Sequence, residues 1–279
     1  MDKYFILSNG LKVANIGLGT YQLPDDESTS ELIRQAIQAG YRHIDCSPSY
    51  YNAKAISEGI FTSGIDRKEI CISTKARNRE RGREKTYQGA LDRMKDLNID
   101  YIDMYLLHWP ASVKDYDNWK EVNRDTWQGM IDLYKDGIAR SIGVCNFLPH
   151  HLDCIMDMEI QPMVNQIEFH PGFMQKEAYE YCLKNNIVVE AHTPLGGSRN
   201  TGNEELKKMA EKYGKNEGQL YLRWELQKGT IPLPKSTKIE RVISNFDVYD
   251  FEISDEDVKY LDEMECFVTN NQHPDSVEF

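Results

Sequence analysis

Short apolar runs alternate with longer amphipathic segments along almost the whole chain. Eight of the runs are strand candidates, at residues 13–19, 43–46, 70–75, 102–108, 139–146, 163–169, 187–193 and 230–235. The segments between them place apolar residues at helical spacing, as Tyr87, Ala90, Leu91 and Met94 do. Because the runs are mostly apolar and each is followed by a helical segment, the pattern predicts a parallel sheet that is covered by helices.

Eight strand-helix repeats in about 250 residues are typical of a closed barrel. The predicted fold class is therefore α/β, a single (β/α)₈ TIM barrel that forms one domain over residues 1–279. Apolar residues flank Asn9-Gly10, and this pattern predicts a short β-hairpin within residues 1–13. The last segment, residues 266–279, has no periodicity, and we expect it to wrap over one end of the barrel or to stay mobile.

Composition and charge narrow the range of functions. The chain has 33 Lys and Arg against 45 Asp and Glu, a net charge of −12, so we expect neither nucleic acid nor an anionic membrane as a partner. The six cysteines form no CxxC pair, and no signal-like start or run of about 18 apolar residues occurs. These features predict a reduced, cytoplasmic protein, and we expect a monomer. A mostly basic cluster at residues 77–85 is interpreted as a solvated loop.

Polar side chains end three successive apolar runs. Asp45 and Tyr50 follow the second run, Lys75 ends the third and His108 ends the fourth. Each alone has an ordinary explanation, because an Asp can cap a helix, a Tyr can pack with its hydroxyl outward and a Lys can face water. Active sites of such barrels lie at the carboxyl ends of the strands. Together, the four side chains are therefore a candidate catalytic group.

Seven segments, in order along nearly the whole chain, resemble the aldo-keto reductase family. They read GLGTYQ (17–22), GYRHIDCSPSYYN (40–52), STKA (73–76), YIDMYLLHWP (101–110), SIGVCNF (141–147), VNQIEFHP (164–171) and IPLPKSTKIERVISN (231–245). The compact chain looks like the microbial members, similar to diketogluconate and aldehyde reductases. The resemblance implies an enzyme that reduces aldehydes or ketones to alcohols with NADPH. It also implies that Asp45, Tyr50, Lys75 and His108 are its catalytic residues.

The chemistry of carbonyl reduction agrees with these four side chains. The reaction delivers a hydride to carbon and a proton to oxygen, and a phenol with a pKa near ~10 is a weak acid at neutral pH. We expect the Lys75 ammonium to lower the pKa of Tyr50, and Asp45 to hold and compensate the buried Lys75. Tyr50 is therefore the expected proton donor, and His108 is expected to orient the substrate oxygen.

A phosphate-binding site is predicted after the last strand. Lys235-Ser236-Thr237 opens a helix that carries Arg241 about one turn inside it, although an ordinary capped helix with surface cations would have the same pattern. The earlier Gly17-Leu18-Gly19 is not read as a dinucleotide motif, because Gln22 stands where the third glycine is required. The resemblance implies that NADPH/NADP⁺ is bound by Thr20, Tyr21, Asp45, Asn146, Gln166, His192, Thr193, Leu195, Lys235, Ser236, Thr237, Arg241, Ser244 and Asn245.

Two amide side chains, Asn146 and Gln166, end apolar runs. The resemblance implies that both bind the nicotinamide carboxamide, and a hydrogen-bonded core amide is the alternative. Two neighbouring positions depart from the family pattern. Cys145 replaces the usual serine and is a weaker hydrogen-bond donor, and His192 replaces the usual aromatic ring that stacks on the nicotinamide.

Aromatic residues close to the candidate catalytic group are expected to line a substrate pocket, although core packing could also explain them. The expected pocket residues are Tyr21, Tyr50, Tyr51, His108 and Trp109. His150-His151 follows the fifth strand candidate without a third ligand at a regular spacing, so we interpret the pair as solvated and expect no metal. The expected substrate is a small-molecule carbonyl compound.

Two other functions stay open from the sequence. A nucleotide-binding sensor or regulatory barrel with little turnover could use the same fold and cofactor site. An aldolase-type barrel would need a Lys75 that is free to attack a carbonyl group, or a metal. Substrate choice is expected to depend on the loops at residues 111–119 and 195–203 and on the tail.

Overall fold

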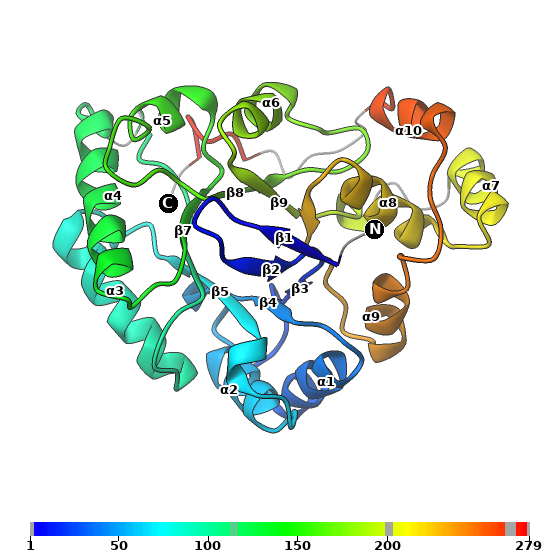
Figure 1. Cartoon of the computed structure of the whole chain (residues 1–279), viewed down its shortest axis with the longest axis horizontal. Helices are drawn as coiled ribbons and strands as arrows, with labels where there is room; N and C mark the ends of the chain where they lie inside the picture. Colours follow the sequence, from blue (N-terminus) through cyan, green and yellow to red (C-terminus); the bar gives the residue numbers. More distant parts are fainter. Residues whose placement is uncertain (1–2, 113, 115, 199–202, 266–271, 278–279) are drawn as a thin grey trace.

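The centre of the computed structural model is a sheet of eight parallel strands, which helices surround (Figure 1). The structure describes the chain except for residues 1–2, 113, 115, 199–202, 266–271 and 278–279. The strands pair in sequential order from β3 to β10. They are β3 (Leu18–Gly19), β4 (His43–Asp45), β5 (Cys71–Ala76), β6 (Met104–Leu107), β7 (Ile142–Cys145), β8 (Val164–Glu168), β9 (Val188–His192) and β10 (Ile231–Pro232). Each predicted apolar run overlaps one of them, and the predicted fold class is confirmed.

The first and last strands meet and close the barrel. The backbone N–H of Gly17 donates to the oxygen of Pro232 at 3.0 Å, and the N–H of Gly19 donates to the oxygen of Pro234 at 3.1 Å. A Cβ on Gly19 would lie only 2.9 Å from the backbone oxygen of Leu233. Glycine is therefore needed here for a close approach between strands, which is a different use from a dinucleotide-binding turn.

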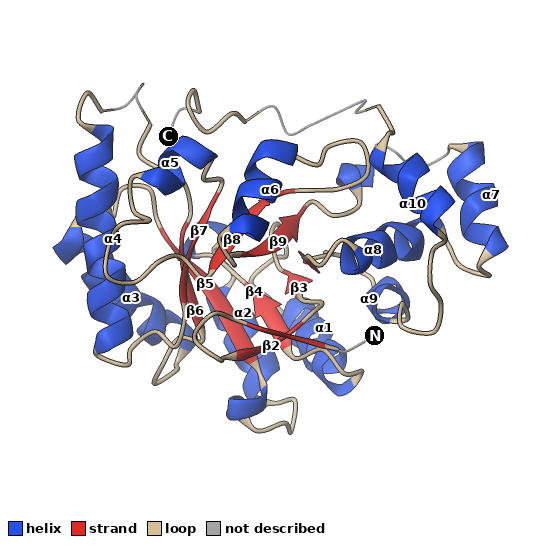
Figure 2. Cartoon of the chain, turned by 45° about the horizontal axis from the view of Figure 1, so that its top comes forward, coloured by secondary structure: helices blue, strands red, loops and turns tan. Residues whose placement is uncertain are grey.

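One helix follows each strand and packs around the barrel, as Figure 2 shows from a second angle. These helices are α1 (Glu27–Gln38), α2 (Ala53–Phe61), α3 (Arg83–Leu97), α4 (Trp119–Lys135), α5 (Pro149–Asp153), α6 (Lys176–Lys184), α8 (Glu217–Gln227) and α9 (Ile239–Phe246). Two further helices, α7 (Glu204–Lys212) and α10 (Asp255–Asp262), lie at the edge of the molecule in Figure 1. No helix in the described part of the chain is both long and apolar enough to cross a membrane.

Helix α1 illustrates how the sequence forms these helices. The Asp26 side chain accepts hydrogen bonds from the backbone N–H groups of Ser28 and Thr29, which satisfies donors that the first turn leaves unpaired. Ile33 and Ile37 are four residues apart and fully buried, so they lie on the face that packs against the barrel.

The hairpin before the barrel is antiparallel and joins β1 (Tyr4–Ile6) to β2 (Lys12–Ala14). Its turn contains Gly10 with φ +86°, a conformation that favours glycine. The hairpin prediction is correct, but the strand reaches Ala14. Residues 13 and 14 therefore belong to the hairpin and not to the first barrel strand as predicted, because they pair with β1.

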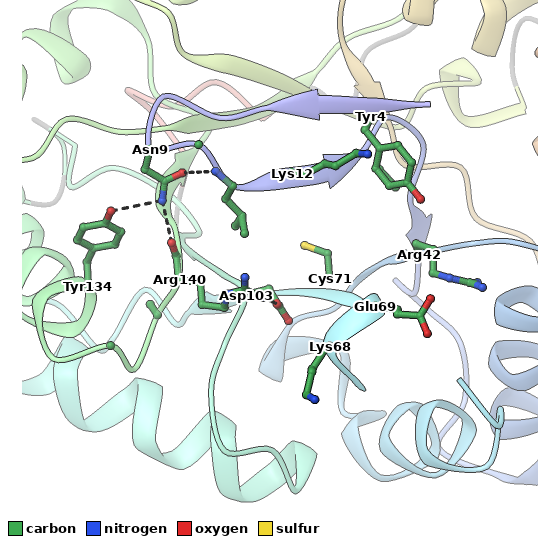
Figure 3. A pocket seen from close by; sticks show the side chains of 15 residues that line it. Tyr4, Asn9, Lys12, Arg42, Lys68, Glu69, Cys71, Asp103, Tyr134 and Arg140 are labelled. Carbon is green, nitrogen blue, oxygen red and sulfur yellow. Dashed lines mark hydrogen bonds and ion pairs between the residues drawn. The ribbon is translucent and has the colours of Figure 1, made fainter. Parts of the chain in front are cut away.

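A cavity of about 690 Å³ lies between the hairpin and the amino-terminal ends of the strands (Figure 3). Lys12 from the hairpin lines it together with Arg42, Lys68 and Arg140, which precede barrel strands. The Asn9 amide closes one side by donating to the backbone oxygen of Arg140 at 2.9 Å. This cavity is at the opposite end of the barrel from the candidate catalytic residues.

The basic cluster at residues 77–85 is only in part a solvated loop, because α3 begins at Arg83. The Arg81 guanidinium donates to the backbone oxygens of Trp109 and Pro110 at 3.1 and 2.8 Å. Arg81 thereby ties this loop to the segment that follows β6. The prediction missed this contact because the partners are carbonyl groups, which carry no sequence signal.

Candidate active site

The centre of the site is a buried ion pair at the carboxyl ends of β4 and β5. Asp45 is opposite Ser73 in the strand register, and Lys75 follows two residues later on the same face. The Lys75 Nζ lies 2.7 and 2.8 Å from the two carboxylate oxygens of Asp45, and 3.2 Å from the backbone oxygen of Cys46. The Ser73 hydroxyl adds a 2.9 Å hydrogen bond to Asp45 Oδ1. The site thus satisfies both charges inside the barrel.

Both members of the pair are charged at neutral pH. Burial alone would lower the pKa of Lys75, but the Asp45 carboxylate holds it above its ordinary value. Burial alone would raise the pKa of Asp45, but Lys75 and the hydrogen-bond donors hold it below its ordinary value. A protonated Lys75 cannot attack a carbonyl group, so the structure disfavours the aldolase-type alternative.

Tyr50 lies beside this pair at the end of the 3₁₀ helix η1 (Pro48–Tyr50). Its ring centroid is 5.3 Å from Lys75 Nζ, 6.3 Å from the His108 ring and 5.0 Å from the Tyr21 ring. The structure therefore brings the four predicted catalytic side chains together, although their sequence positions span three strands.

The pKa of Tyr50 differs from the sequence expectation. Burial raises it, and the opposing effect of Lys75 is smaller, so the pKa lies above its ordinary value and not below it. The expected lowering was wrong because the desolvation of the phenol could not be judged from sequence. Tyr50 is consequently a protonated phenol at neutral pH, which is the form that a proton donor requires.

His108 follows β6 and is a neutral imidazole. Burial lowers its pKa to about 3, and the nearby Lys75 ammonium acts in the same direction. Its backbone oxygen accepts a 3.0 Å hydrogen bond from the Asn146 amide nitrogen. A neutral ring can share a hydrogen bond with a carbonyl oxygen without bringing a charge into the site.

The two predicted amide ligands both have protein partners. Gln166 Nε2 donates to Asp45 Oδ1 at 3.0 Å and to Glu190 Oε2 at 2.9 Å. No described residue donates to Gln166 Oε1, so this oxygen is available as an acceptor. Asn146, at φ +60°, donates to His108, and its Oδ1 is 3.2 Å from His192 Nε2.

His192 ends β9 and makes two contacts of its own. Because Asn146 Oδ1 is an acceptor, His192 Nε2 is the donor in their 3.2 Å contact, and the ring carries its proton there. His192 Nδ1 lies 3.2 Å from the Thr193 hydroxyl. Burial lowers the pKa of His192 to about 4, although Glu168 opposes this effect. The ring is therefore neutral at neutral pH.

Cys145, the other departure from the family pattern, is buried at the end of β7. Burial holds the pKa of its thiol well above the ordinary value, so Cys145 stays a neutral thiol. Thr20 is also buried, and its hydroxyl donates to the backbone oxygen of Asp45 at 2.9 Å. The structure thus places Thr20 as a support for Asp45.

The predicted phosphate site lies between β10 and α9. The helix begins at Ile239, two residues after Thr237, and the preceding Lys238 provides no side-chain cap. The Ser236 hydroxyl instead accepts a 3.0 Å hydrogen bond from the Lys238 N–H. Among the described residues, Lys235 and Arg241 have no hydrogen-bond or ion-pair partner for their side chains. Two free cations therefore lie near an open helix start.

Three other predicted cofactor ligands lie around the same helix. Ser244 Oγ accepts a 3.1 Å hydrogen bond from the Asn216 side chain, so it links α9 to the start of α8. The Asn245 side chain is buried and has no hydrogen-bond partner in the described part of the chain. Leu195, after β9, lies near Gly218 at the start of α8.

The expected pocket residues differ in their surroundings. Tyr21 is half exposed beside Tyr50, and Trp109 is buried. Tyr51 keeps 80% of its surface exposed and has φ +56°, an unusual conformation for a bulky residue. Tyr51 therefore lies at the surface, and its place in a substrate pocket stays a prediction.

His150 is half exposed, in line with the predicted solvated pair, but His151 is buried. Asp275, from the described tail segment 272–277, accepts from both rings, with Oδ1 at 2.9 and 3.0 Å from their Nε2 atoms. His151 is buried, and its Nδ1 accepts the Leu148 N–H at 3.2 Å, so its Nε2 must carry the proton. One ligand atom from each of His150, His151 and Asp275 lies within 4.8 Å of the others, so the structure adds a third potential metal ligand that the sequence did not indicate, and a metal bound at His151 Nε2 would have to displace this proton. Figure 1 shows this red segment beside α5.

A family profile described as "Aldo/keto reductase family" matches residues 15–265. The chain belongs to the aldo/keto reductase family. The family resemblance and the prediction of a reductase are therefore confirmed. The match includes the four candidate catalytic residues and the predicted phosphate site.

Relatives of known name agree with this membership. Glyoxal reductase of Bacillus subtilis (strain 168) is 40% identical over 274 residues, 98% of this chain and 96% of the relative. Methylglyoxal reductase DkgA of Escherichia coli (strain K12) is 35% identical over 255 residues, 90% of each chain. A crystal structure of a Gox0644 mutant in complex with NADPH has a TM-score of 0.91, with 33% identity and coverage of 100% of both chains.

Sequence reasoning missed a set of polar side chains inside the barrel. His43, Ser73 and Glu190 are fully buried on strands β4, β5 and β9; Ser73 contacts Asp45, Glu190 contacts Gln166, and His43 contacts Ser73. A signal was present, because His43 and Ser73 each stand two residues before a predicted catalytic side chain. Alternate residues of a strand share a face, so this spacing could have indicated an inward polar row.

Proposed function

We propose that the chain reduces aldehydes or ketones to alcohols with NADPH, and that Tyr50 donates the proton. The observation that carries the proposal is the buried Asp45–Lys75 pair beside the Tyr50 phenol, with the neutral His108 ring near it. An acid, a charge that stabilises its conjugate base and a hydrogen-bonding ring are the groups that carbonyl reduction requires.

The described residues suit NADPH at both of its ends. Lys235 and Arg241 are cations without protein partners, as a 2′-phosphate requires. At the other end, Gln166 Oε1 is a free acceptor for a carboxamide N–H. When bound, NADPH supplies the hydride. The solved Gox0644 relative that holds NADPH supports this choice of cofactor.

Lys75 assists the proton transfer from Tyr50. As the phenol loses its proton, a negative charge forms on a ring whose centroid is 5.3 Å from the Lys75 Nζ, and the ammonium stabilises that charge. Asp45 keeps Lys75 in place and charged, and its own pKa stays low. His108 orients the carbonyl oxygen toward Tyr50 through a hydrogen bond.

The substrate class that we propose is small reactive carbonyl compounds, including α-dicarbonyls. Two relatives named glyoxal reductase and methylglyoxal reductase support it. The charge of −12 supports the absence of nucleic acid and membrane partners. The five described cysteines are unpaired, which supports a cytoplasmic location. We further propose that residues 1–279 act as one barrel domain and as a monomer.

The test is NADPH consumption, followed by absorbance, with a panel of glyoxal, methylglyoxal, simple aldehydes and ketones. We expect turnover by the native chain, and Tyr50→Phe should lose at least about nine-tenths of kcat while its Kd for NADPH is unchanged. If Tyr50→Phe keeps a larger share of kcat, Tyr50 is not the proton donor. If the native chain binds NADPH but turns over no member of the panel, the sensor alternative is favoured.

A further inference from the structure

Beside the catalytic ion pair, the barrel interior contains a second carboxyl group. Glu190 is fully buried on β9. Its Oε2 accepts a hydrogen bond from Gln166 Nε2 at 2.9 Å, and its Oε1 lies 3.5 Å from His43 Nε2 without a hydrogen-bond partner among the described residues. A buried carboxyl group is costly unless it is paired or neutral, so Glu190 is not explained by packing alone.

Glu190 fixes the orientation of the Gln166 amide. The amide nitrogen has two hydrogens, and one is donated to Asp45 Oδ1 at 3.0 Å and the other to Glu190 Oε2. With both hydrogens used inside the barrel, Gln166 Oε1 is left without a protein donor. A rotated amide would direct its oxygen at two carboxyl groups, which is unfavourable. The contacts therefore select one of the two amide orientations.

The charge of the barrel interior depends on Glu190. Asp45 and Lys75 cancel, so ionisation of Glu190 changes the local net charge from zero to −1. Burial and the Asp45 charge raise the pKa of Glu190 to about 8, against smaller opposing effects of Gln166 and Lys75. Glu190 therefore changes charge just above neutral pH.

The other titratable groups that face Glu190 do not change charge in this range. Burial lowers the pKa of His43 to about 4, so the ring is neutral. Burial holds the pKa values of the Cys71 and Cys145 thiols well above the ordinary value. Asp45 stays charged, as does Lys75. Among the groups that face one another here, a titration near pH 8 is therefore specific to Glu190.

We propose that Glu190 is a positioning residue for the reduction, holding Gln166 Oε1 toward the nicotinamide carboxamide and setting the relative affinity of the site for NADP⁺ and NADPH. The inference rests on the proposed function, because it assumes that this cofactor binds over Gln166. The oxidised nicotinamide ring is cationic and the reduced ring is neutral. An ionised Glu190 therefore favours NADP⁺ over NADPH.

The experiment is a set of fluorescence titrations with NADPH and with NADP⁺ between about pH 6.5 and 9.5. In the native chain, the Kd of NADP⁺ relative to that of NADPH should fall about fivefold as pH rises through the titration of Glu190. Glu190→Gln keeps an acceptor for Gln166 but cannot ionise, so its NADPH affinity should match that of the native chain and the pH dependence should vanish. Glu190→Ala removes the acceptor for Gln166, so its Kd for NADPH should rise about tenfold.

A matched control is available in Glu225, a buried glutamate on α8 whose carboxyl oxygens have no described partner. Its pKa is also raised by burial, well above the ordinary value. Glu225→Gln should leave the pH dependence of the Kd ratio as in the native chain. If Glu225→Gln loses the pH dependence of the Kd ratio to the same extent as Glu190→Gln, the effect is not specific to Glu190 and the proposal is overturned.

Two other results would also overturn the role of Glu190. One is a Glu190→Gln variant with the same pH dependence as the native chain. The other is a folded Glu190→Ala variant with native affinity for NADPH. By contrast, a native chain that binds neither cofactor would refute the proposed function itself, so the two failures are distinguishable.

Discussion

The Asp45–Lys75 pair allows a quantitative test of how charge is held inside the barrel. The Lys75 side chain is 0% exposed and that of Asp45 is 6% exposed, with Nζ–O distances of 2.7 and 2.8 Å. Asp45→Asn keeps the shape of the side chain but leaves a buried ammonium without its counter-ion. Breaking one partner of a buried pair costs about 3–5 kcal/mol, so the free energy of unfolding near neutral pH should fall by that amount.

The loss should depend on pH with a defined sign. In the native chain the pKa of Lys75 is raised, so its contribution to stability is constant below the unfolded value of about 10.4 and declines above it. In Asp45→Asn, burial acts without the carboxylate and lowers the pKa of Lys75 below the unfolded value. The unfolded chain then binds more protons, and the stability of the variant should rise with pH, by up to about 1.4 kcal/mol per pH unit.

The assay is urea unfolding, followed by tryptophan fluorescence, at about pH 6, 8 and 9.5. The matched control is the double variant Asp45→Asn with Lys75→Met, which removes both charges and should regain most of the lost stability. A loss below about 1 kcal/mol near neutral pH, or a stability of Asp45→Asn that falls as pH rises, would show that the pair is solvated and would refute this reasoning.

The cofactor contacts lead to two more expectations. In the native chain, the Kd for NADPH should be about 100-fold lower than the Kd for NADH. Arg241→Gln should weaken the binding of NADPH and leave the binding of NADH unchanged. Equal Kd values for the two cofactors in the native chain would rule out a phosphate contact. His192→Tyr should bind NADPH more tightly by about 0.5–1.5 kcal/mol, because a larger ring stacks better, and weaker binding in titrations would contradict this. Since the pKa of His192 is about 4, this ring stays neutral between about pH 6 and 8, so His192→Tyr should leave the pH dependence of the NADP⁺ to NADPH affinity ratio in that range as it is in the native chain.

The sequence was sufficient to predict the barrel and to bring the four candidate catalytic side chains together at one end of it. Apolar runs with a helical segment between them have one economical arrangement, and polar residues at strand ends must then converge at one mouth. This is why the sequence pattern alone places Asp45, Lys75 and His108 together. Helix starts were less predictable, and α9 begins at Ile239 because Ser236 caps the turn before it.

The features that the sequence did not predict depend on contacts between distant segments of the chain. The pairing of Asp275 with His151 joins the tail to α5, and neither segment has a periodic pattern that indicates the other. The pKa of Tyr50 depended on how deeply the phenol is buried, which only the packed structure reveals. Glu190 was overlooked because a single acid in an apolar run has no partner until β8 and β9 are side by side.

The closure of the barrel through Gly17 and Gly19 has a consequence for folding kinetics. β3 comes early in the chain and β10 comes late, so their pairing raises the contact order and is expected to slow folding. Until β10 docks, β3 and β9 each present an unpaired edge that can join another chain. Lys235 follows β10 directly, and its Cβ lies 3.7 Å from the Cβ position of Gly19. The Lys235 side chain therefore reaches this place only when β10 pairs with β3. A cofactor held by Lys235 would bind only the closed barrel and would stabilise it by mass action.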